Sequence, residues 1–244
     1  MGNRVVIFGT TEMAIMTHFY LTHDSPHEVV AFTVDRDFIK EKTLCGLPVV
    51  PFEDIESLYP PADHRMIVAI MFGRLNKIRS EKYSQAKAKG YELISYISSK
   101  AMTWPELELG DNSLILEGSA VGPFVKIGNN VIIGGSAIGH HTVIKDHCFL
   151  AAHAAILGCV TIEPYCFIGA NSTIQQWSVI GKECIIGAGA IINKSTPERS
   201  VFINKPAEML PQTSDQFITW LTWPARGRRA KATAGEQQEV KGST

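Results

Sequence analysis

The stretch IGHHTVIKDHCFLAAHAAILGCVTIEPYCFIGANSTIQQWSVIGKECIIGAGAII, residues 138–192, decides the fold. Every sixth residue in it, from Ile138 to Ile192, is an isoleucine or a leucine. The same step continues upstream, with one gap of five residues, through Ile115, Val121, Ile127 and Ile133. A strict period of six fits neither the 3.6-residue period of a helix nor the two-residue alternation of an ordinary strand.

A period of six is typical of a triangular coil in which each side is one short strand. Three sides make an 18-residue turn, and stacked turns lie about 4.8 Å apart, the spacing of hydrogen-bonded strands. The fourteen aliphatic anchors would fill the interior, at three per turn, so we predict a parallel β-helix of about five coils. A glycine often follows the anchor, and we expect these glycines at corners that need unusual backbone angles. They are Gly122, Gly128, Gly134, Gly139, Gly169, Gly181 and Gly187.

Three cysteines test this register. Cys148, Cys166 and Cys184 follow one another at intervals of one full turn and fall on the small position of the repeat. We expect them to form one inward-facing column, one per coil, as small core residues rather than metal ligands.

Residues 1–104 follow a different pattern. Short apolar runs at 4–8, 29–34 and 66–70 alternate with helical stretches at 11–21 and 75–89. In the first helix we expect Met13, Met16 and Phe19 on one side. Continuous apolar strands between helices predict a parallel sheet covered on both faces, an α/β, Rossmann-like domain. The β-helix would occupy residues 105–210, a short C-terminal helix 211–225, and a polar tail without fixed structure 226–244.

Composition excludes several classes of protein. The net charge is −1, so no basic excess suggests nucleic acid. The apolar runs are too short for a transmembrane helix and no signal peptide is recognisable, so we predict no membrane association. Five cysteines without a C-x-x-C pair indicate reduced thiols in a cytoplasmic protein, and we predict no disulfide.

Four histidines crowd into one and a half coils: His140, His141, His147 and His153. Histidine is the natural general base near neutral pH, and acyl transfer from a thioester to an amine needs such a base. By register, His140 and His141 point outward near a corner, where a neighbouring subunit could cover them. Zinc is the alternative use of such a cluster, as in β-helical carbonic anhydrases. The gaps of six and seven residues between these histidines do not match the zinc ligands of those enzymes, which are one distant histidine and a close pair. We therefore predict no metal.

Local sequence supports a closer resemblance. The segments 138–147, 158–162 and 167–170, together with Gly46-Leu47-Pro48-Val49-Val50 and Lys205-Pro206-Ala207, resemble the hexapeptide-repeat sugar acyltransferases. Within these, the chain resembles the sialic-acid O-acetyltransferase-like group, which includes bacterial N-acetyltransferases of nucleotide-linked amino sugars. The resemblance covers residues 4–210. It implies a Rossmann-like domain, a left-handed β-helix, a homotrimer and acetyl-CoA, or another acyl-CoA, as co-substrate.

The resemblance also implies roles for single residues. His140 follows Ile-Gly, where the family has its catalytic base, and His141 occupies a position that is commonly acidic or Asn. The acyl-CoA would lie in a groove between subunits, where the plausible contacts are His153, Gly158, Ala170, Gly187, Lys194 and Lys205. The nucleotide sugar would bind the first domain through Gly9, Thr10, Thr11, Asp35, Arg36 and Gly73.

The sequence therefore predicts an N-acyltransferase that moves a short acyl group from acyl-CoA to the amine of a nucleotide-linked sugar, for bacterial surface-glycan synthesis such as that of lipopolysaccharide O-antigen. Two alternatives remain open at this point. One is a sugar or sialic-acid O-acetyltransferase, because the same base would serve a hydroxyl. The other is a non-catalytic β-helix that binds a nucleotide sugar as a scaffold.

Overall fold

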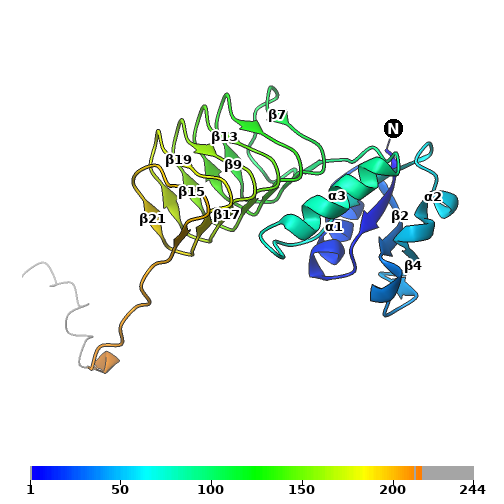
Figure 1. Cartoon of the computed structure of the whole chain (residues 1–244), viewed down its shortest axis with the longest axis horizontal. Helices are drawn as coiled ribbons and strands as arrows, with labels where there is room; N and C mark the ends of the chain where they lie inside the picture. Colours follow the sequence, from blue (N-terminus) through cyan, green and yellow to red (C-terminus); the bar gives the residue numbers. More distant parts are fainter. Residues whose placement is uncertain (1, 212, 216–244) are drawn as a thin grey trace, which may run out of the picture. The chain divides into compact units, whose positions relative to one another are not determined.

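The structure is a computed structural model that describes residues 2–211 and 213–215 (Figure 1). The described residues up to Asn204 belong to one compact unit, and the described residues from Lys205 onward belong to a second. The compact unit contains an α/β part followed by a stack of short parallel strands. The predicted C-terminal helix from residue 216 onward and the whole predicted tail lie outside the described residues.

The α/β part is built on a five-stranded sheet in the order β3-β4-β2-β1-β5. Its strands are β1 (Arg4–Phe8), β2 (Glu28–Val34), β3 (Thr43–Leu44), β4 (Leu47–Pro51) and β5 (His64–Val68). All pairings are parallel except that of β3 with β4. Its helices are α1 (Glu12–His23), α2 (Ile55–Leu58) and α3 (Lys77–Ala88), with 3-10 turns at Arg36–Phe38 and Phe52–Asp54. The apolar strands β1, β2 and β5 and the two long helices thus form where the sequence predicted them.

The buried side of α1 differs from the prediction. Met13 is buried together with Ala14, Thr17 and Leu21, whereas Met16 and Phe19 are exposed. The predicted set was wrong because steps of three turn backward around a helix of 3.6 residues per turn, away from the side on which Ala14, Thr17 and Leu21 lie.

The stack of strands fits a left-handed β-helix with three faces. Face 1 contains β6 (Tyr96–Ile97), β8 (Leu114–Ile115), β11 (Ile132–Ile133), β14 (Phe149–Leu150), β17 (Phe167–Ile168), β20 (Ile185–Ile186) and β22 (Val201–Phe202). Face 2 contains β9 (Ala120–Val121), β12 (Ala137–Ile138), β15 (Ala155–Ile156), β18 (Thr173–Ile174) and β21 (Ile191–Ile192). Face 3 contains β7 (Glu108–Leu109), β10 (Lys126–Ile127), β13 (Val143–Ile144), β16 (Thr161–Ile162) and β19 (Val179–Ile180).

The aliphatic anchors occupy the interior, as the period predicted. From Ile115 to Ile192 they belong to one buried core, and each pairs in register with the anchor of the next coil. The gap of five falls at the corner between β11 and β12, where Gly135 adopts a φ of +70°. The corner is shorter there, so the partners Ile133 and Leu150 are closer in sequence than the paired anchors of later coils. Strands β6 and β7 precede the first predicted anchor, and Leu109 continues its six-residue step.

The glycines that follow the anchors have a different role from the one expected. None of them has a positive φ. A Cβ at Gly139 would lie 2.5 Å from the backbone nitrogen of Gly158, and one at Gly169 would lie 2.6 Å from that of Ala188. Close stacking of the coils, rather than backbone angle, therefore favours glycine at this position.

Left-handed backbone occurs at a different position of the repeat. From His141 to Gly189, every sixth residue has a φ between 55° and 68°. Most of these residues carry side chains, and three of them are His141, His147 and His153. Histidine is among the residues enriched in this conformation, so the histidine spacing follows in part from corner geometry.

The cysteine column forms as predicted. Cys148, Cys166 and Cys184 are fully buried in the β-helix core. Each thiol donates to a carbonyl further along the stack, the Cys148 Sγ to Glu163 at 3.2 Å and the Cys184 Sγ to Pro197 at 3.0 Å. Burial raises the pKa of the Cys148 thiol well above its usual range, so this thiol stays neutral in the core.

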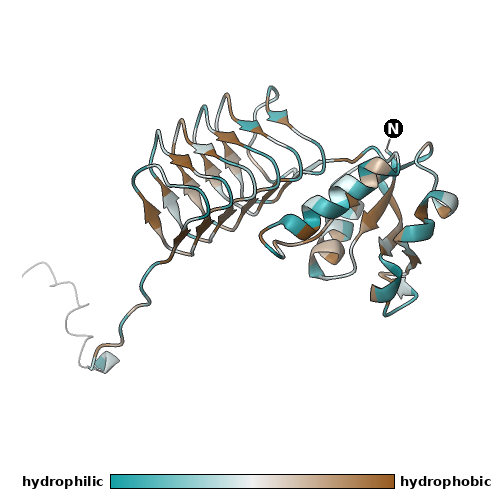
Figure 2. Ribbon diagram, in the orientation of Figure 1, coloured by the Kyte–Doolittle hydropathy of each residue, from teal (hydrophilic) through white to brown (hydrophobic). Residues whose placement is uncertain are grey.

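Face 1 packs against the α/β part. Leu114, Ile132 and Phe149 point outward from face 1 into the same buried cluster as residues of β1, β2 and α1. Phe72, in the loop after β5, contacts the rings of Phe149 and Phe167 with centroids 5.1 and 4.8 Å away. Hydrophobic residues follow the strands of both parts, whereas α3 is largely hydrophilic (Figure 2). Within the described ranges, no helix has the length and apolar character needed to cross a membrane.

Candidate active site

The corner between faces 2 and 3, called here the 2–3 edge, carries His140 and His141. Both residues lie between β12 and β13, and both are exposed in the single chain. The backbone N–H of His141 donates to the Pro123 carbonyl at 3.1 Å, and the N–H of Cys159 donates to the His140 carbonyl at 2.8 Å. These bonds tie the corner to the coils on either side of it.

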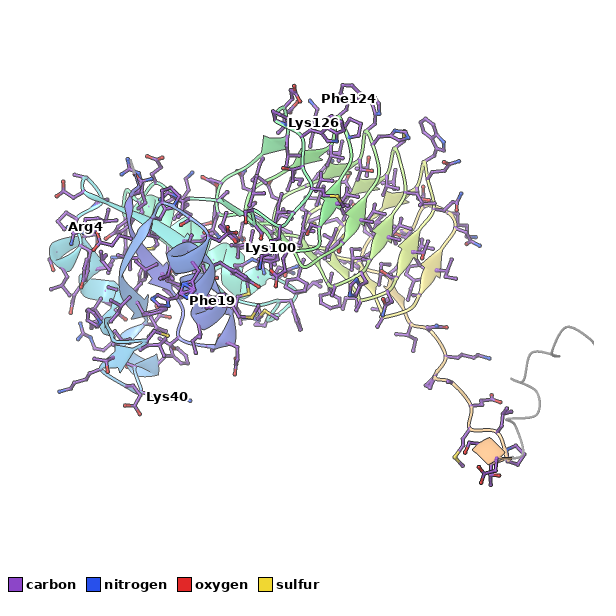
Figure 3. The ribbon with its side chains drawn as sticks, turned by 180° about the vertical axis from the view of Figure 1, so that it is seen from behind. Arg4, Phe19, Lys40, Lys100, Phe124 and Lys126 are labelled. Atoms are coloured by element: carbon purple, nitrogen blue, oxygen red, sulfur yellow. The ribbon has the colours of Figure 1, made fainter. Side chains whose placement is uncertain are left out.

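The two imidazoles form a contacting pair. Nδ1 of His140 lies 3.0 Å from Nδ1 of His141, and the Sγ of Cys159 lies 4.0 Å from the same His140 nitrogen. The His141 ring also rests on Phe124, with centroids 4.7 Å apart. Phe124 itself projects into solvent, 72% exposed (Figure 3).

Gly158 leaves room for the His140 ring. A Cβ at residue 158 would lie 2.7 Å from Nε2 and 2.8 Å from Cε1 of His140. The Nε2 edge of the ring therefore lies directly over a backbone that has no side chain. A larger residue at position 158 would have to displace the imidazole.

Gly139 and Gly158 also line an apolar groove of about 610 Å³ along face 2. Its floor consists of small outward residues, and its other walls are large apolar side chains from the first coil and the 2–3 edge. These residues are Ala120, Ala137, Ala155, Met102, Trp104 and Leu157. The groove places His140 beside a long apolar surface that has room for an extended ligand.

The four clustered histidines do not form one site. His153 lies at the corner between faces 1 and 2, the 1–2 edge, and His147 lies at the corner between faces 3 and 1, the 3–1 edge. His147 is partly buried, and its Nδ1 lies 2.8 Å from the Nδ2 of Asn130. The ring centroids of Tyr83 and Tyr165 lie 5.6 and 4.8 Å from that of His147. Burial lowers the pKa of His147, which favours a neutral, packed imidazole.

The residues assigned to acyl-CoA lie along both edges of face 2. Gly158 and Lys194 are on the 2–3 edge, and His153, Ala170 and Gly187 are on the 1–2 edge. Lys205 belongs to the second unit rather than to the unit that contains the groove. Among the residues that the structure describes, no group of three or more His, Cys, Asp or Glu side chains is arranged to hold a metal ion.

The residues assigned to the nucleotide sugar gather at the carboxyl ends of parallel strands. Gly9, Thr10 and Thr11 connect β1 to α1, Asp35 and Arg36 follow β2, and Gly73 lies in the loop after β5. Ligands of open parallel sheets bind at these ends. A Cβ at Gly9, whose φ is +127°, would lie 2.8 Å from the Ala69 carbonyl oxygen.

Charged partners already surround part of this region. Lys82 pairs with Asp35 at 2.7 Å, and Arg36 pairs with Asp54 at 2.7 Å. Asp35 and Glu53 also line a shallow pocket with Gln85 and Lys89.

Arg79 is a structural residue of this region that the sequence pattern did not indicate. It is fully buried, and its guanidinium donates to the carbonyls of Ile70, Met71, Asn130 and Cys148 and to the Asn130 side chain, at 3.0–3.2 Å. It thus fixes the loop after β5 to the 3–1 edge of the β-helix. Its place in a polar helix gave no sign of burial, because that depends on what packs against the helix.

Comparisons with known proteins support the same architecture. A family model described as the GMPPB C-terminal domain matches residues 95–204. No curated protein sequence matches the chain.

Three solved structures are similar over nearly the whole compact unit. WeeI from Acinetobacter baumannii is 25% identical, with a TM-score of 0.70, covering 85% of this chain and 99% of that one. A variant of perosamine N-acetyltransferase from Caulobacter crescentus, in complex with CoA and GDP-perosamine, is 23% identical with a TM-score of 0.73, covering 86% and 98%. The acetyltransferase domain of PglB from Neisseria gonorrhoeae is 20% identical with a TM-score of 0.75, covering 86% and 100%.

The chain therefore has the fold of the hexapeptide-repeat N-acetyltransferases, and the resemblance predicted from the sequence is confirmed at the level of the fold.

Proposed function

We propose that the protein is a CoA-dependent N-acyltransferase that acetylates the amine of a nucleotide-linked sugar. The observation that carries the proposal is the placement of His140, whose Nε2 lies over Gly158, a residue that lines an apolar groove. Proteins with this fold are described in complex with CoA and GDP-perosamine and with acetyl coenzyme A. An exposed base beside a long groove suits an extended thioester and a separately bound amine.

The chemistry needs one proton acceptor. The lone pair of the sugar nitrogen attacks the thioester carbonyl carbon, and Nε2 of His140 takes the proton that the nitrogen loses. The tetrahedral intermediate then collapses, the C–S bond breaks, and the CoA sulfur leaves as the thiol with the proton returned by His140. Backbone N–H groups along the coils are suited to stabilise the oxyanion. The thioester is already activated, so no metal is required.

The α/β part would be a Rossmann-like domain that holds the nucleotide. The loops at residues 9–11 and 35–36 and at Gly73 share the carboxyl edge of the sheet. The N-terminus of α1 there favours a phosphate, and the Asp35 carboxylate favours a ribose or base donor.

The site would be completed by a second subunit. The α/β part packs on face 1, whereas His140 lies on the 2–3 edge, opposite face 1 in a three-sided prism. One chain therefore holds its nucleotide loops and its base on different sides of the β-helix. A homotrimer with clefts between prisms would bring the base of one subunit to the nucleotide domain of another. The small outward residues of face 2, such as Ala137 and Ala155, allow such close approach.

The product would be an N-acetylated nucleotide sugar for surface-glycan assembly, such as that of O-antigen, and we propose that this takes place in the cytoplasm. Transfer to a sugar hydroxyl would use the same base. A panel of acceptors with either an amine or only hydroxyls separates the two reactions.

The test is a thiol-release assay with acetyl-CoA and uridine-, thymidine- and guanosine-linked amino sugars. We expect turnover with at least one amino sugar, and His140→Asn should lower kcat by roughly 10²–10⁴, the usual contribution of a positioned base. His23→Asn, at an exposed histidine of α1, is the matched control and should leave the rate unchanged. Nucleotide-sugar binding without any thiol release would favour the scaffold instead. A monomer by light scattering at micromolar concentration would contradict the shared cleft.

A further inference from the structure

The end of β5 is held from the β-helix by one side chain. Asn112 lies at the 3–1 edge, between β7 and β8, and it is buried. Its Oδ1 accepts the backbone N–H of Val68 at 2.7 Å, and its Nδ2 donates to the Val68 carbonyl at 3.3 Å. β5 lies at one edge of its sheet, and such a strand presents backbone groups that need partners. The Asn112 amide therefore supplies the acceptor and the donor that a further strand would supply.

A second asparagine fixes the orientation of this amide. Nδ2 of Asn112 also donates to Oδ1 of Asn130 at 2.8 Å, and the same oxygen accepts from Nε of Arg79 at 3.0 Å. Asn112 and Asn130 both have left-handed backbone, with φ of 52° and 56°, a conformation in which asparagine is enriched. Because Nδ2 of Asn112 faces two oxygen atoms, an ionised carboxylate at position 112 would have no proton to share with either of them.

Val68 leads directly into the loop that we assign to the nucleotide sugar. The next residue is Ala69, and Gly73 follows four residues later. The Ala69 N–H donates to the Phe8 carbonyl at 2.9 Å, and the Ala69 carbonyl oxygen would lie 2.8 Å from a Cβ at Gly9. The loop after β5 thus lies against the loop after β1. A shift at the end of β5 would displace both loops.

We propose that Asn112 is a positioning residue for the nucleotide-linked acceptor. It acts through the backbone of Val68, which holds the loops that carry Gly9 and Gly73. The inference rests on the proposed function, because it gives the β-helix of the same chain a part in binding the nucleotide. The apolar groove runs along face 2, whereas Asn112 lies at the 3–1 edge. Loss of the Asn112 amide should therefore weaken binding of the nucleotide sugar and leave binding of acetyl-CoA unchanged.

Aspartate at the two asparagine positions has opposite expected effects. In Asn112→Asp a carboxylate faces the Val68 carbonyl and the Asn130 Oδ1, so two donated hydrogen bonds become repulsive contacts. We expect the KM for the nucleotide sugar to rise roughly 10-fold or more, with the KM for acetyl-CoA within about twofold. In Asn130→Asp the carboxylate keeps Arg79 and Asn112 as donors, and only the contact with Nδ1 of His147 changes. We expect the KM for the nucleotide sugar to stay within about threefold in this variant.

A second variant and a control separate the clamp from buried charge and from backbone strain. Asn112→Gly removes the amide without burying a carboxylate, and glycine accepts left-handed backbone, so this variant tests the inference even if Asn112→Asp does not fold. It should raise the KM for the nucleotide sugar in the same direction. Asn171→Gly makes the same change at an exposed left-handed corner with a φ of 55° and should leave that KM unchanged.

Hydrogen exchange of the full-length protein gives a readout that does not depend on turnover. Amides of residues 69–76 should exchange faster in both Asn112 variants and at the wild-type rate in Asn130→Asp, because local opening follows the loss of local contacts. All assays are run well below the Tm of each variant, so that global unfolding does not contribute.

Two results would overturn the inference and leave the proposed function intact. One is a lower Tm in Asn112→Gly with unchanged KM values and unchanged exchange at residues 69–76, since Asn112 would then be structural only. The other is an equal rise in the KM for both substrates, since the whole chain would then have loosened. A wild type that neither turns over nor binds any nucleotide sugar would instead refute the proposed function, and the exchange rates would still decide whether Asn112 holds the loop.

Discussion

Replacing Arg79 with lysine should loosen the α/β part from the β-helix by a predictable amount. The guanidinium makes five hydrogen bonds, to Ile70, Met71, Cys148 and both the side chain and carbonyl of Asn130. Burial lowers the pKa of Arg79 to about 9, so the group still carries its charge at neutral pH. A lysine ammonium has three donors, so at least two of the five hydrogen bonds are lost.

Each lost hydrogen bond costs about 1–1.5 kcal/mol, so Arg79→Lys should lower the free energy of unfolding by about 2–3 kcal/mol. For a chain of this size, that corresponds to a fall in Tm of roughly 5–10 °C. Circular dichroism melts of the wild type and the variant measure the change. Because Arg79 holds the loop after β5, the KM for the nucleotide sugar should also rise.

The matched control is Arg74→Lys, which makes the same change at an exposed residue of that loop. It should change Tm by less than about 1 °C, because exposed substitutions away from such networks have small effects. If Arg79→Lys melted at nearly the wild-type temperature, the five bonds would not hold the two parts together. Equal falls in Tm for both variants would assign the effect to arginine chemistry in general and refute the burial argument.

Three further outcomes follow from the site and its supports. Gly158→Ala should lower kcat at least tenfold without changing Tm by more than a few degrees, because its Cβ would lie 2.7 Å from Nε2 of His140; an unchanged kcat would mean that the ring is free to move away. Because burial lowers the pKa of His147, the unfolded chain takes up the proton first as pH falls below about 6.5, so the urea midpoint should drop between pH 7.5 and 5. His147→Asn should flatten the pH dependence of the urea midpoint. If the wild type and the variant showed the same pH dependence, His147 would not be its source. Asp35→Asn should raise the KM for the nucleotide sugar roughly 10-fold or more and leave CoA affinity unchanged, as measured by calorimetry; loss of both would indicate misfolding instead.

The architecture could be derived from the sequence because the β-helix is a one-dimensional repeat. Each coil contacts mainly its neighbours, so one large aliphatic residue every sixth position is enough to fix the interior. The same regularity predicted the buried column of Cys148, Cys166 and Cys184. The repeat did not show which corner positions need a glycine for close stacking of coils and which adopt left-handed backbone. Gly139 is needed for close stacking of coils, whereas left-handed backbone occurs two residues later, at His141.

Closeness along the chain does not measure closeness in space for the histidines of this fold. Residues six apart in this fold lie on successive corners of the prism, so His141, His147 and His153 fall on three different edges. Two residues lie close in space when whole turns of the β-helix separate them, and not when they are six positions apart. By that measure His141 has Cys159 and Phe124 as neighbours, and the His140–Cys159 contact could have been predicted.

The sequence by itself determined the β-helix, its interior, the parallel α/β sheet and the outward position of His140, because each depends on a local period or on the ends of strands. The tertiary structure alone decided which face the α/β part covers, that Arg79 is buried between the two parts, and that the Nδ1 atoms of His140 and His141 face each other. These features depend on contacts between residues that are not spaced by any repeat of the sequence. A side chain's partner in such a contact is set by the packing of whole elements, which the local pattern of the chain does not contain.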